Sequence, residues 1–229
     1  MAGADSVLAR VMALRGSWIG RGDRDRTQFH TLGAASYLDF CCSDDPRRDY
    51  LERAPEENTL LWLEFDDLYE SLRSTLENHL GEPVAFTDVF ALPGFHIFMG
   101  EAIASAARAP VHFDGQYQYL PWERPLDLVP PISFTLPISL PAAGGGLDLW
   151  NLTPHDVRRA GDMGMDTDID RIKDRKHKTF HPYSRGVMAL HSGLLLHRIG
   201  DVGPMGPRDH RITLQGHGVR VDGTWLLHW

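Results

Sequence analysis

Residues 132–140 read ISFTLPISL, a run in which β-branched and aromatic side chains dominate. Such a run between prolines is typical of a buried strand. Runs of the same texture, separated by proline and glycine, occupy residues 84–91, 95–99, 111–120, 146–152, 186–190, 194–199, 210–215 and 224–229. The part of the chain after Pro83 is therefore predicted to hold about eight or nine short strands.

One long helix is predicted before these strands, over residues 59–80. Its apolar positions recur at spacings of four, three, four and four residues, as one face of a helix requires; they are Leu61, Phe65, Leu68, Leu72 and Leu76. Gly81 and Pro83 end it. Residues 16–58 predict mostly irregular structure behind a short helix capped by Ser6. The order predicts a β-sandwich or barrel braced on one side by helix.

Length, charge and cysteine content exclude several classes of protein. The 229 residues fit one domain, and the net charge of −8 argues against non-specific binding to nucleic acid or to an anionic membrane. No apolar run is long enough to span a bilayer. Cys41 and Cys42 are adjacent and predict free thiols, which with the lack of a secretory signal indicates the cytoplasm.

A polar segment, residues 153–185, interrupts the strands. A short helix is expected near Ile169–Lys176. The segment is long for a connection, so a lid over the site and a solvated insertion both remain open.

Three groups of residues carry the chemistry. His112-Phe113-Asp114 would place an imidazole and a carboxylate on one face of a strand. His197 lies in an apolar run 83 residues after Asp114, and Arg211-Ile212-Thr213 begins 14 residues beyond it. Two histidines and one carboxylate form the facial triad of non-haem Fe(II) oxygenases. A buried arginine needs an anionic partner, and a ligand carboxylate fits its fork of donors.

Together these residues resemble the Fe(II)/2-oxoglutarate-dependent dioxygenases over residues 84–229, and Gly144–Trp150 is similar to that family's glycine-started central strand. The resemblance implies a mainly β fold, a cupin-like double-stranded β-helix (jelly roll), with helices packed on its larger sheet. Residues 1–83 would form the helical and irregular N-terminal part of a single 1–229 domain.

The resemblance also implies the site. His112, Asp114 and His197 would hold Fe(II), while Arg211 and Thr213 would hold the distal carboxylate of the cosubstrate 2-oxoglutarate, and O2 would take the remaining position. Gln116, or in its place Gln118 or Tyr119, would contact the other carboxylate. Because Asp114 stands where related halogenases have a small residue, hydroxylation is favoured over chlorination. Desaturation, epoxidation and ring closure use the same triad and stay open.

Other residues have weaker assignments. His191 is the rival distal ligand, and His96 is a candidate for the pocket wall. Four further histidines are expected at the surface: His177, His181, His217 and His228. Tyr117, Tyr119, Trp122 and Trp150 are aromatic candidates for pocket walls, although a core role is commoner for such residues. Arg124, or the cluster Arg171–Lys178, would pair with an anionic substrate or form a solvated charged face.

The predicted activity is hydroxylation of an unactivated C–H bond in a small molecule, such as an amino acid, small peptide or biosynthetic intermediate, with succinate and CO2 as coproducts. No nucleic-acid or membrane partner is expected. The alternatives are a hydroxylase of protein or peptide residues, and a cupin-like metal-binding protein or isomerase that uses no oxoglutarate.

Overall fold

The computed structural model describes residues 3–21, 28–40, 46–100, 102–103, 110–203, 206 and 208–229. Cys41 and Cys42, the predicted free thiols, lie outside these ranges. Within them no helix is long and apolar enough to cross a membrane.

The larger of two sheets is organised around the long strand β10 (His210–Val221). One edge of β10 pairs with β4 (Gly94–Met99) over its first half and with β11 (Thr224–His228) over its second half. Its other edge pairs with β5 (Ile132–Ser139). The remaining strands of this sheet are β1 (Ile19–Gly20), β2 (Phe29–Leu32), β3 (Val84–Phe86) and β8 (Ala189–Ser192), and of its pairings only that of β3 with β11 is parallel.

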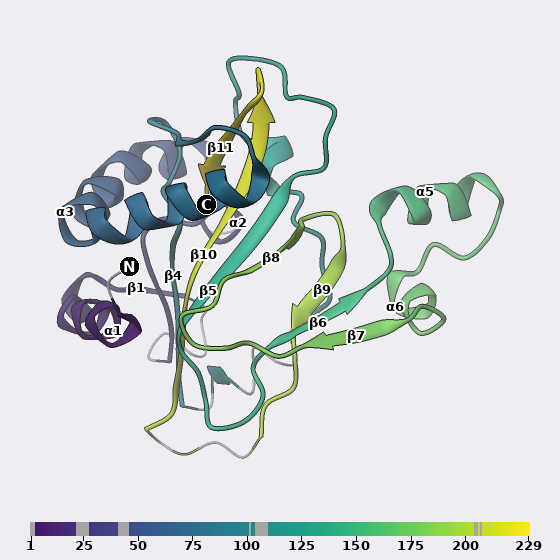
Figure 1. Cartoon of the computed structure of the whole chain (residues 1–229). Helices are drawn as coiled ribbons and strands as arrows, with labels where there is room; N and C mark the ends of the chain where they lie inside the picture. Colours follow the sequence, from purple (N-terminus) through teal and green to yellow (C-terminus); the bar gives the residue numbers. More distant parts are fainter. Residues whose placement is uncertain are drawn as a thin grey trace.

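Helices cover one face of this sheet. Figure 1 shows α1 (Ala4–Ala13) and α3 (Pro46–Leu80) together on that side. The five apolar positions predicted to form one face of the helix are at most 3% exposed, and they pack with Phe95, Ile97, Ile212 and Leu214 of the sheet. The helix begins at residue 46 and not at 59, because Tyr50 and Ala54 extend the buried face among the charged residues that precede it.

Alternation along the strands sends the other side chains to the opposite face. On β4, Phe95 and Ile97 join the helix-facing core, whereas His96 and Phe98 line a cavity. On β10, Ile212 and Leu214 are core residues, whereas Arg211, Gln215 and His217 line the same cavity. Successive strand residues point to opposite faces, so one sheet builds both the core and a polar site.

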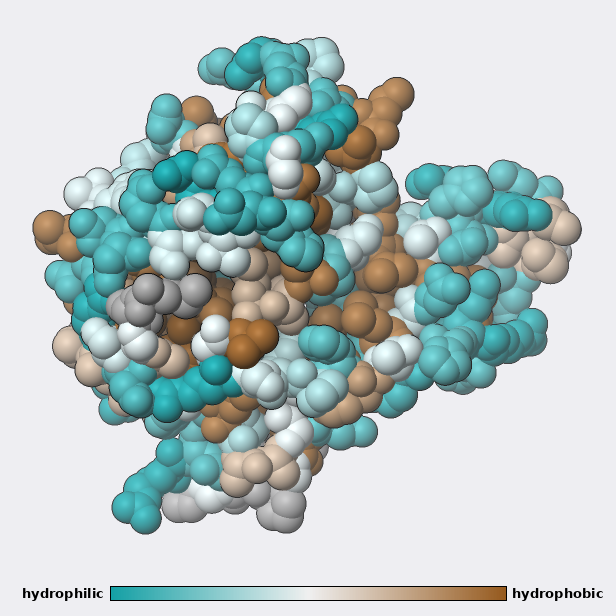
Figure 2. Space-filling model, viewed as in Figure 1, coloured by the Kyte–Doolittle hydropathy of each residue, from teal (hydrophilic) through white to brown (hydrophobic). Residues whose placement is uncertain are grey.

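A smaller antiparallel sheet of β7 (Lys178–His181), β6 (Leu147–Trp150) and β9 (Leu196–Ile199) supplies the other wall of that cavity. The predicted segment 153–185 contains α5 (Pro154–Asp162), α6 (Ile169–Lys173) and strand β7. Thr153 and Asp156 form a capping box at the start of α5. Figure 1 shows α5 and α6 projecting from the body, and Figure 2 shows apolar residues where this lobe joins it.

The prediction of a strand over residues 111–120 was wrong. His112 makes an isolated bridge with His197, and residues 116–119 form a turn of 3₁₀-helix, η2 (Gln116–Tyr119). Glycine at position 115 and the polar residues after it interrupt the extended run after Asp114. The short elements β1, β2, η1 (Arg15–Ser17) and α2 (Ser36–Asp39) lie in the N-terminal part predicted to be mostly irregular.

Candidate active site

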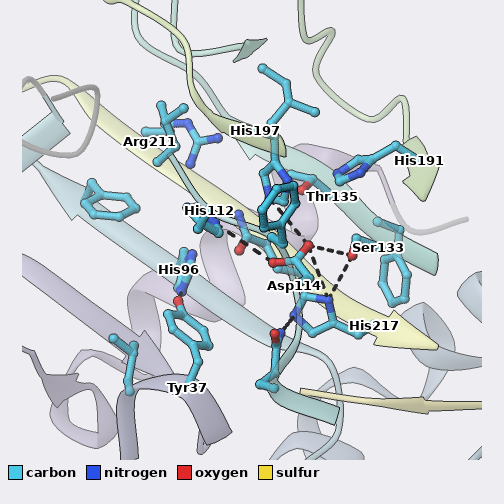
Figure 3. A pocket seen from close by; sticks show the side chains of 18 of the residues that line it. Tyr37, His96, His112, Asp114, Ser133, Thr135, His191, His197, Arg211 and His217 are labelled. Carbon is cyan, nitrogen blue, oxygen red and sulfur yellow. Dashed lines mark hydrogen bonds and ion pairs between the residues drawn. The ribbon is translucent and has the colours of Figure 1, made fainter. Parts of the chain in front are cut away.

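A cavity of about 720 Å³ lies between the two sheets and contains most of the predicted site (Figure 3). Its walls come from β4, β5 and β10 of the larger sheet, from β6 and β9 of the smaller one, and from the loop that carries His112 and Asp114. Sites of this size usually hold small organic ligands.

Backbone hydrogen bonds bring His112, Asp114 and His197 together. The amides of His112 and His197 each donate to the other residue's carbonyl oxygen at 3.0 Å, and the Asp114 amide donates to Gly193 O at 2.8 Å. The His112 Nε2 atom lies 3.9 Å from Asp114 Oδ1, and His197 Nε2 lies 3.4 Å from Asp114 Oδ2. One ligand atom from each residue lies within 4.8 Å of the other two, as a shared metal ion requires.

In both histidines of this triad, Nε2 is the ring nitrogen available to bind a metal ion. His112 Nδ1 lies 3.2 Å from Pro110 O, and His197 Nδ1 lies 2.8 Å from Leu195 O. A carbonyl oxygen only accepts hydrogen bonds, so each Nδ1 carries the proton and each Nε2 keeps a lone pair. This arrangement of a carbonyl behind a ligating imidazole is common in metal sites, where it fixes the ring's orientation.

Electrostatics keep Asp114 ionised although it is buried. Burial raises the pKa of this carboxyl, but His197, His217, His112 and the hydrogen bond from Ser133 outweigh it and bring the pKa to about 2. Burial lowers the pKa of His197, so its imidazole favours the neutral form that binds metals. The triad therefore offers two imidazole nitrogens and one carboxylate, the donor set of a non-haem iron site.

Arg211 is buried in the same cavity with part of its guanidinium unpaired. Its Nε donates to Gly145 O at 3.0 Å, and its guanidinium lies over the Tyr183 ring at 5.7 Å. One terminal nitrogen is buried without a hydrogen-bond partner in the described structure. Burial lowers the pKa of this side chain, which is 1% exposed. An unpaired buried guanidinium is costly, so the position indicates an anionic ligand.

Of the other residues predicted to contact the cosubstrate, only Gln116 lines the cavity in the described structure. Thr213 is fully buried on β10, but it does not line the cavity, and its hydroxyl accepts a hydrogen bond from Gln215. Gln116 lines the cavity, and its amide nitrogen lies 2.5 Å from His217 Nε2. Gln118 and Tyr119 are exposed and lie outside the lining. Tyr183, which the sequence did not single out, lines the cavity beside Arg211.

Two of the four histidines predicted at the surface are not there. His228 is fully buried, and His217 is largely buried, with its Nδ1 3.7 Å from Asp114 Oδ2. Counting in steps of two from Arg211 would have placed His217 on the cavity face of one continuous strand. His177 and His181 are exposed, whereas His96 and His191 line the cavity.

None of the four aromatic candidates lines the cavity. Trp150 belongs to a small core with Leu152 and Leu196, and Trp122 packs against Phe90. The described aromatic residues of the wall are Phe29, Tyr37, Phe98, Phe113, Phe134 and Tyr183. Arg124 forms an exposed ion pair with Asp222 at 2.5 Å, outside the cavity.

No protein-family model and no curated protein matches the chain. Solved structures do match. One is an N-substituted L-amino acid dioxygenase from Burkholderia ambifaria in complex with α-ketoglutarate, with 13% identity, a TM-score of 0.43, and coverage of 97% of this chain and 91% of that one. The second is a non-haem α-ketoglutarate-dependent epimerase from nogalamycin biosynthesis, with 15% identity, a TM-score of 0.48, and coverage of 96% and 77%.

A third match is a prolyl-4-hydroxylase from Pseudomonas putida, with 13% identity, a TM-score of 0.37, and coverage of 96% of this chain and 88% of that one. All three likenesses are distant. The site's own geometry therefore carries the functional assignment. By that geometry the chain is a β-rich protein with a His-Asp-His metal-binding group and a buried arginine in one cavity.

Proposed function

We propose that this chain is an Fe(II)- and 2-oxoglutarate-dependent oxygenase, a single domain whose residues 84–229 form the family's jelly roll. The observation that carries the proposal is the buried guanidinium of Arg211, which has one terminal nitrogen unpaired among the described residues, in the cavity that holds the triad. If the protein used no oxoglutarate, as in a cupin-like metal-binding protein or isomerase, buried Arg211 would have no function in the site. The distal carboxylate of 2-oxoglutarate would pair with it.

The donor set fits iron. His112, Asp114 and His197 would hold Fe(II) on one face and leave the opposite coordination positions open. When bound, Fe(II) and 2-oxoglutarate supply O2 activation, in which 2-oxoglutarate becomes succinate and CO2 and a substrate C–H bond becomes C–OH.

The protein's own contribution is position and shielding. Arg211 would fix the depth and angle of the cosubstrate through its distal carboxylate, and Tyr183 would cover the guanidinium from the other side. The tautomers of His112 and His197 are set before metal binding by the two carbonyl oxygens behind them. A pre-oriented site of this kind loses little entropy when the metal and the cosubstrate bind.

Anaerobic mixing tests this proposal. Adding Fe(II) and 2-oxoglutarate to the protein should produce the visible charge-transfer absorption of chelated oxoglutarate, and EDTA should remove it. Admission of O2 should then yield succinate in step with 2-oxoglutarate loss. If no band forms and no succinate appears, the oxygenase assignment is incorrect.

The lining favours a small molecule with an apolar body as the substrate. Phe29 and Phe98 stack at 4.3 Å with their rings 3° from parallel, and Ile199 packs against them. Phe113 also lines the cavity. The cavity lies between two sheets and is walled by side chains, whereas a peptide-binding site would present an open groove with free sheet-edge backbone. A small-molecule substrate is therefore favoured over a protein side chain.

A probe of this wall is 2-naphthol, followed by equilibrium dialysis against the metal-free protein. Phe98→Ser should weaken its binding up to about 10-fold, because one aromatic pair contributes roughly 0.5–1.5 kcal/mol. Phe180→Ser is the matched control: that ring is 46% exposed on β7, outside the cavity, and its loss should leave the affinity unchanged. Equal losses in the two variants would argue against an aromatic substrate wall.

A further inference from the structure

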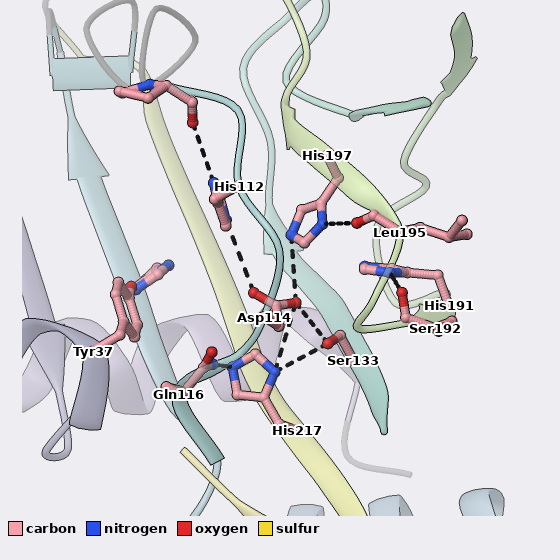
Figure 4. Close-up of polar contacts among 12 residues, drawn as sticks. Tyr37, His112, Asp114, Gln116, Ser133, His191, Ser192, Leu195, His197 and His217 are labelled. Atoms are coloured by element: carbon pink, nitrogen blue, oxygen red, sulfur yellow. Dashed lines mark hydrogen bonds and ion pairs between the residues drawn. The ribbon is translucent and has the colours of Figure 1, made fainter. Parts of the chain in front are cut away.

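Three polar side chains form a chain of hydrogen bonds that ends on the carboxylate of the triad (Figure 4). Ser133 Oγ lies 2.6 Å from Asp114 Oδ2, and His217 Nδ1 lies 3.0 Å from Ser133 Oγ. At the far end, Gln116 Nε2 lies 2.5 Å from His217 Nε2. Ser133 is on β5 and His217 is on β10, so the chain spans two paired strands of the larger sheet.

The direction of these hydrogen bonds follows from the donors available. Ionised Asp114 can only accept, so the single hydroxyl proton of Ser133 is committed to it. The contact between Ser133 and His217 then requires His217 Nδ1 to donate, which leaves Nε2 of the neutral ring as an acceptor. The Gln116 amide nitrogen meets that requirement. Every hydrogen bond in the chain therefore points towards Asp114.

Such a chain fixes the carboxylate's orientation. Asp114 cannot turn about its Cβ–Cγ bond without breaking the hydrogen bond from Ser133. Ser133 in turn is held between Asp114 and the ring of His217, which is largely buried. Partners of this kind orient metal ligands, and their removal typically weakens metal affinity 10- to 100-fold.

We propose that His217 is a positioning residue for the metal site: it acts through Ser133 to hold Asp114 in its ligating orientation, with Gln116 selecting the ring tautomer that donates. This inference rests on the proposed function and changes one part of it. Because its amide nitrogen is bonded to His217, Gln116 serves the carboxylate ligand instead of 2-oxoglutarate.

The test is the affinity for Co(II), a spectroscopic stand-in for Fe(II), measured by its visible absorption without 2-oxoglutarate. His217→Leu removes the donor and should weaken Co(II) binding about 10-fold. His217→Asn retains a nitrogen donor near the place of Nδ1 and should restore the affinity to within about threefold of the natural protein. The shape of the Co(II) absorption should change in the leucine variant only.

A double-mutant cycle shows whether the action passes through Ser133. If it does, the Ser133→Ala, His217→Leu protein should bind Co(II) no more weakly than Ser133→Ala alone. Additive losses would overturn the proposed relay. His228→Leu is the matched control, because His228 is a buried histidine whose ring lies 5.7 Å from that of His217 and whose ring nitrogens lack hydrogen-bond partners in the described structure. It should leave Co(II) affinity unchanged and keep the melting temperature at or above that of the natural protein, because leucine removes two unsatisfied buried nitrogens.

Gln116→Met keeps the proposal testable even if the leucine variant does not fold, because Gln116 is only half-buried. It should weaken Co(II) binding by a few-fold. Natural protein that fails to bind Co(II) would defeat the proposed function itself. Natural protein that binds it, with leucine and methionine variants of equal affinity, would defeat only this inference.

Discussion

Asp114→Ala should abolish oxygenase turnover and weaken Fe(II) binding by more than about 100-fold, beyond the loss typical when an outer partner of a ligand is removed. Two effects combine. The site loses its only anionic ligand among the described residues that line the cavity, and His197 and His217 lose the carboxylate that faces them. Isothermal titration with Fe(II) under argon measures the affinity, and succinate formation measures turnover.

Asp148→Asn provides the comparison for that variant. Asp148 is also buried, at 2% exposure, and its carboxylate pairs with Lys178 and Arg198 on the smaller sheet, outside the cavity. The substitution should lower the free energy of unfolding, because breaking a buried ion pair is destabilising, and it should leave Fe(II) affinity unchanged. Iron binding that survives Asp114→Ala would show that the metal site lies elsewhere.

Arg211→Met should weaken 2-oxoglutarate binding on the order of 100-fold while iron stays bound. One terminal nitrogen of the guanidinium is buried without a partner in the described structure and would bind the carboxylate, and a hydrogen bond to a charged group contributes about 1.5–3 kcal/mol. The charge-transfer absorption should therefore require far higher 2-oxoglutarate, and titration of that band gives the dissociation constant. Arg124→Met, at an exposed arginine, should leave the titration unchanged.

Arg211→Met should weaken 2-oxoglutarate binding, but it should not lower the stability of the protein without ligand. In the protein without ligand, the buried guanidinium has one terminal nitrogen without a partner among the described residues, and apolar replacements of buried charges are often neutral or stabilising. Urea unfolding of Arg211→Met without ligand should therefore give a free energy equal to or above that of the natural protein. A clear loss of stability would indicate that the arginine is structural and that the cosubstrate subsite is misassigned.

Local spacing in the sequence predicted part of the site. The pair His112 and Asp114 was expected to converge because i and i+2 share one face of a strand, yet these residues are not in a strand. Two backbone interactions place them instead. His112 forms a β-bridge with His197, and the amide of Asp114 donates a hydrogen bond to the carbonyl oxygen of Gly193. The two side chains do lie close together, but for a different reason from the one predicted, since the pairing partner is distant in the chain.

His217 and Tyr183 show what spacing misses. Tyr183 belongs to no periodic run, and it reaches Arg211 only because β7 pairs with β6 on the smaller sheet. The hydrogen-bond partners of His217 lie 84 and 101 positions away along the chain. A one-dimensional pattern carries no information on such contacts.

The residue sequence alone determined the apolar face of the long helix and the β-rich texture after Pro83, and it nominated the residues of the proposed metal site. Each of these depends on side-chain type and on short-range or family-typical spacing. Only the tertiary structure decided which polar side chains share the cavity. The strand β10 pairs with β4, β5 and β11 at once, and that pairing places Arg211 and His217 on the face opposite the helices. The function of a buried polar group depends on the neighbours that folding gives it.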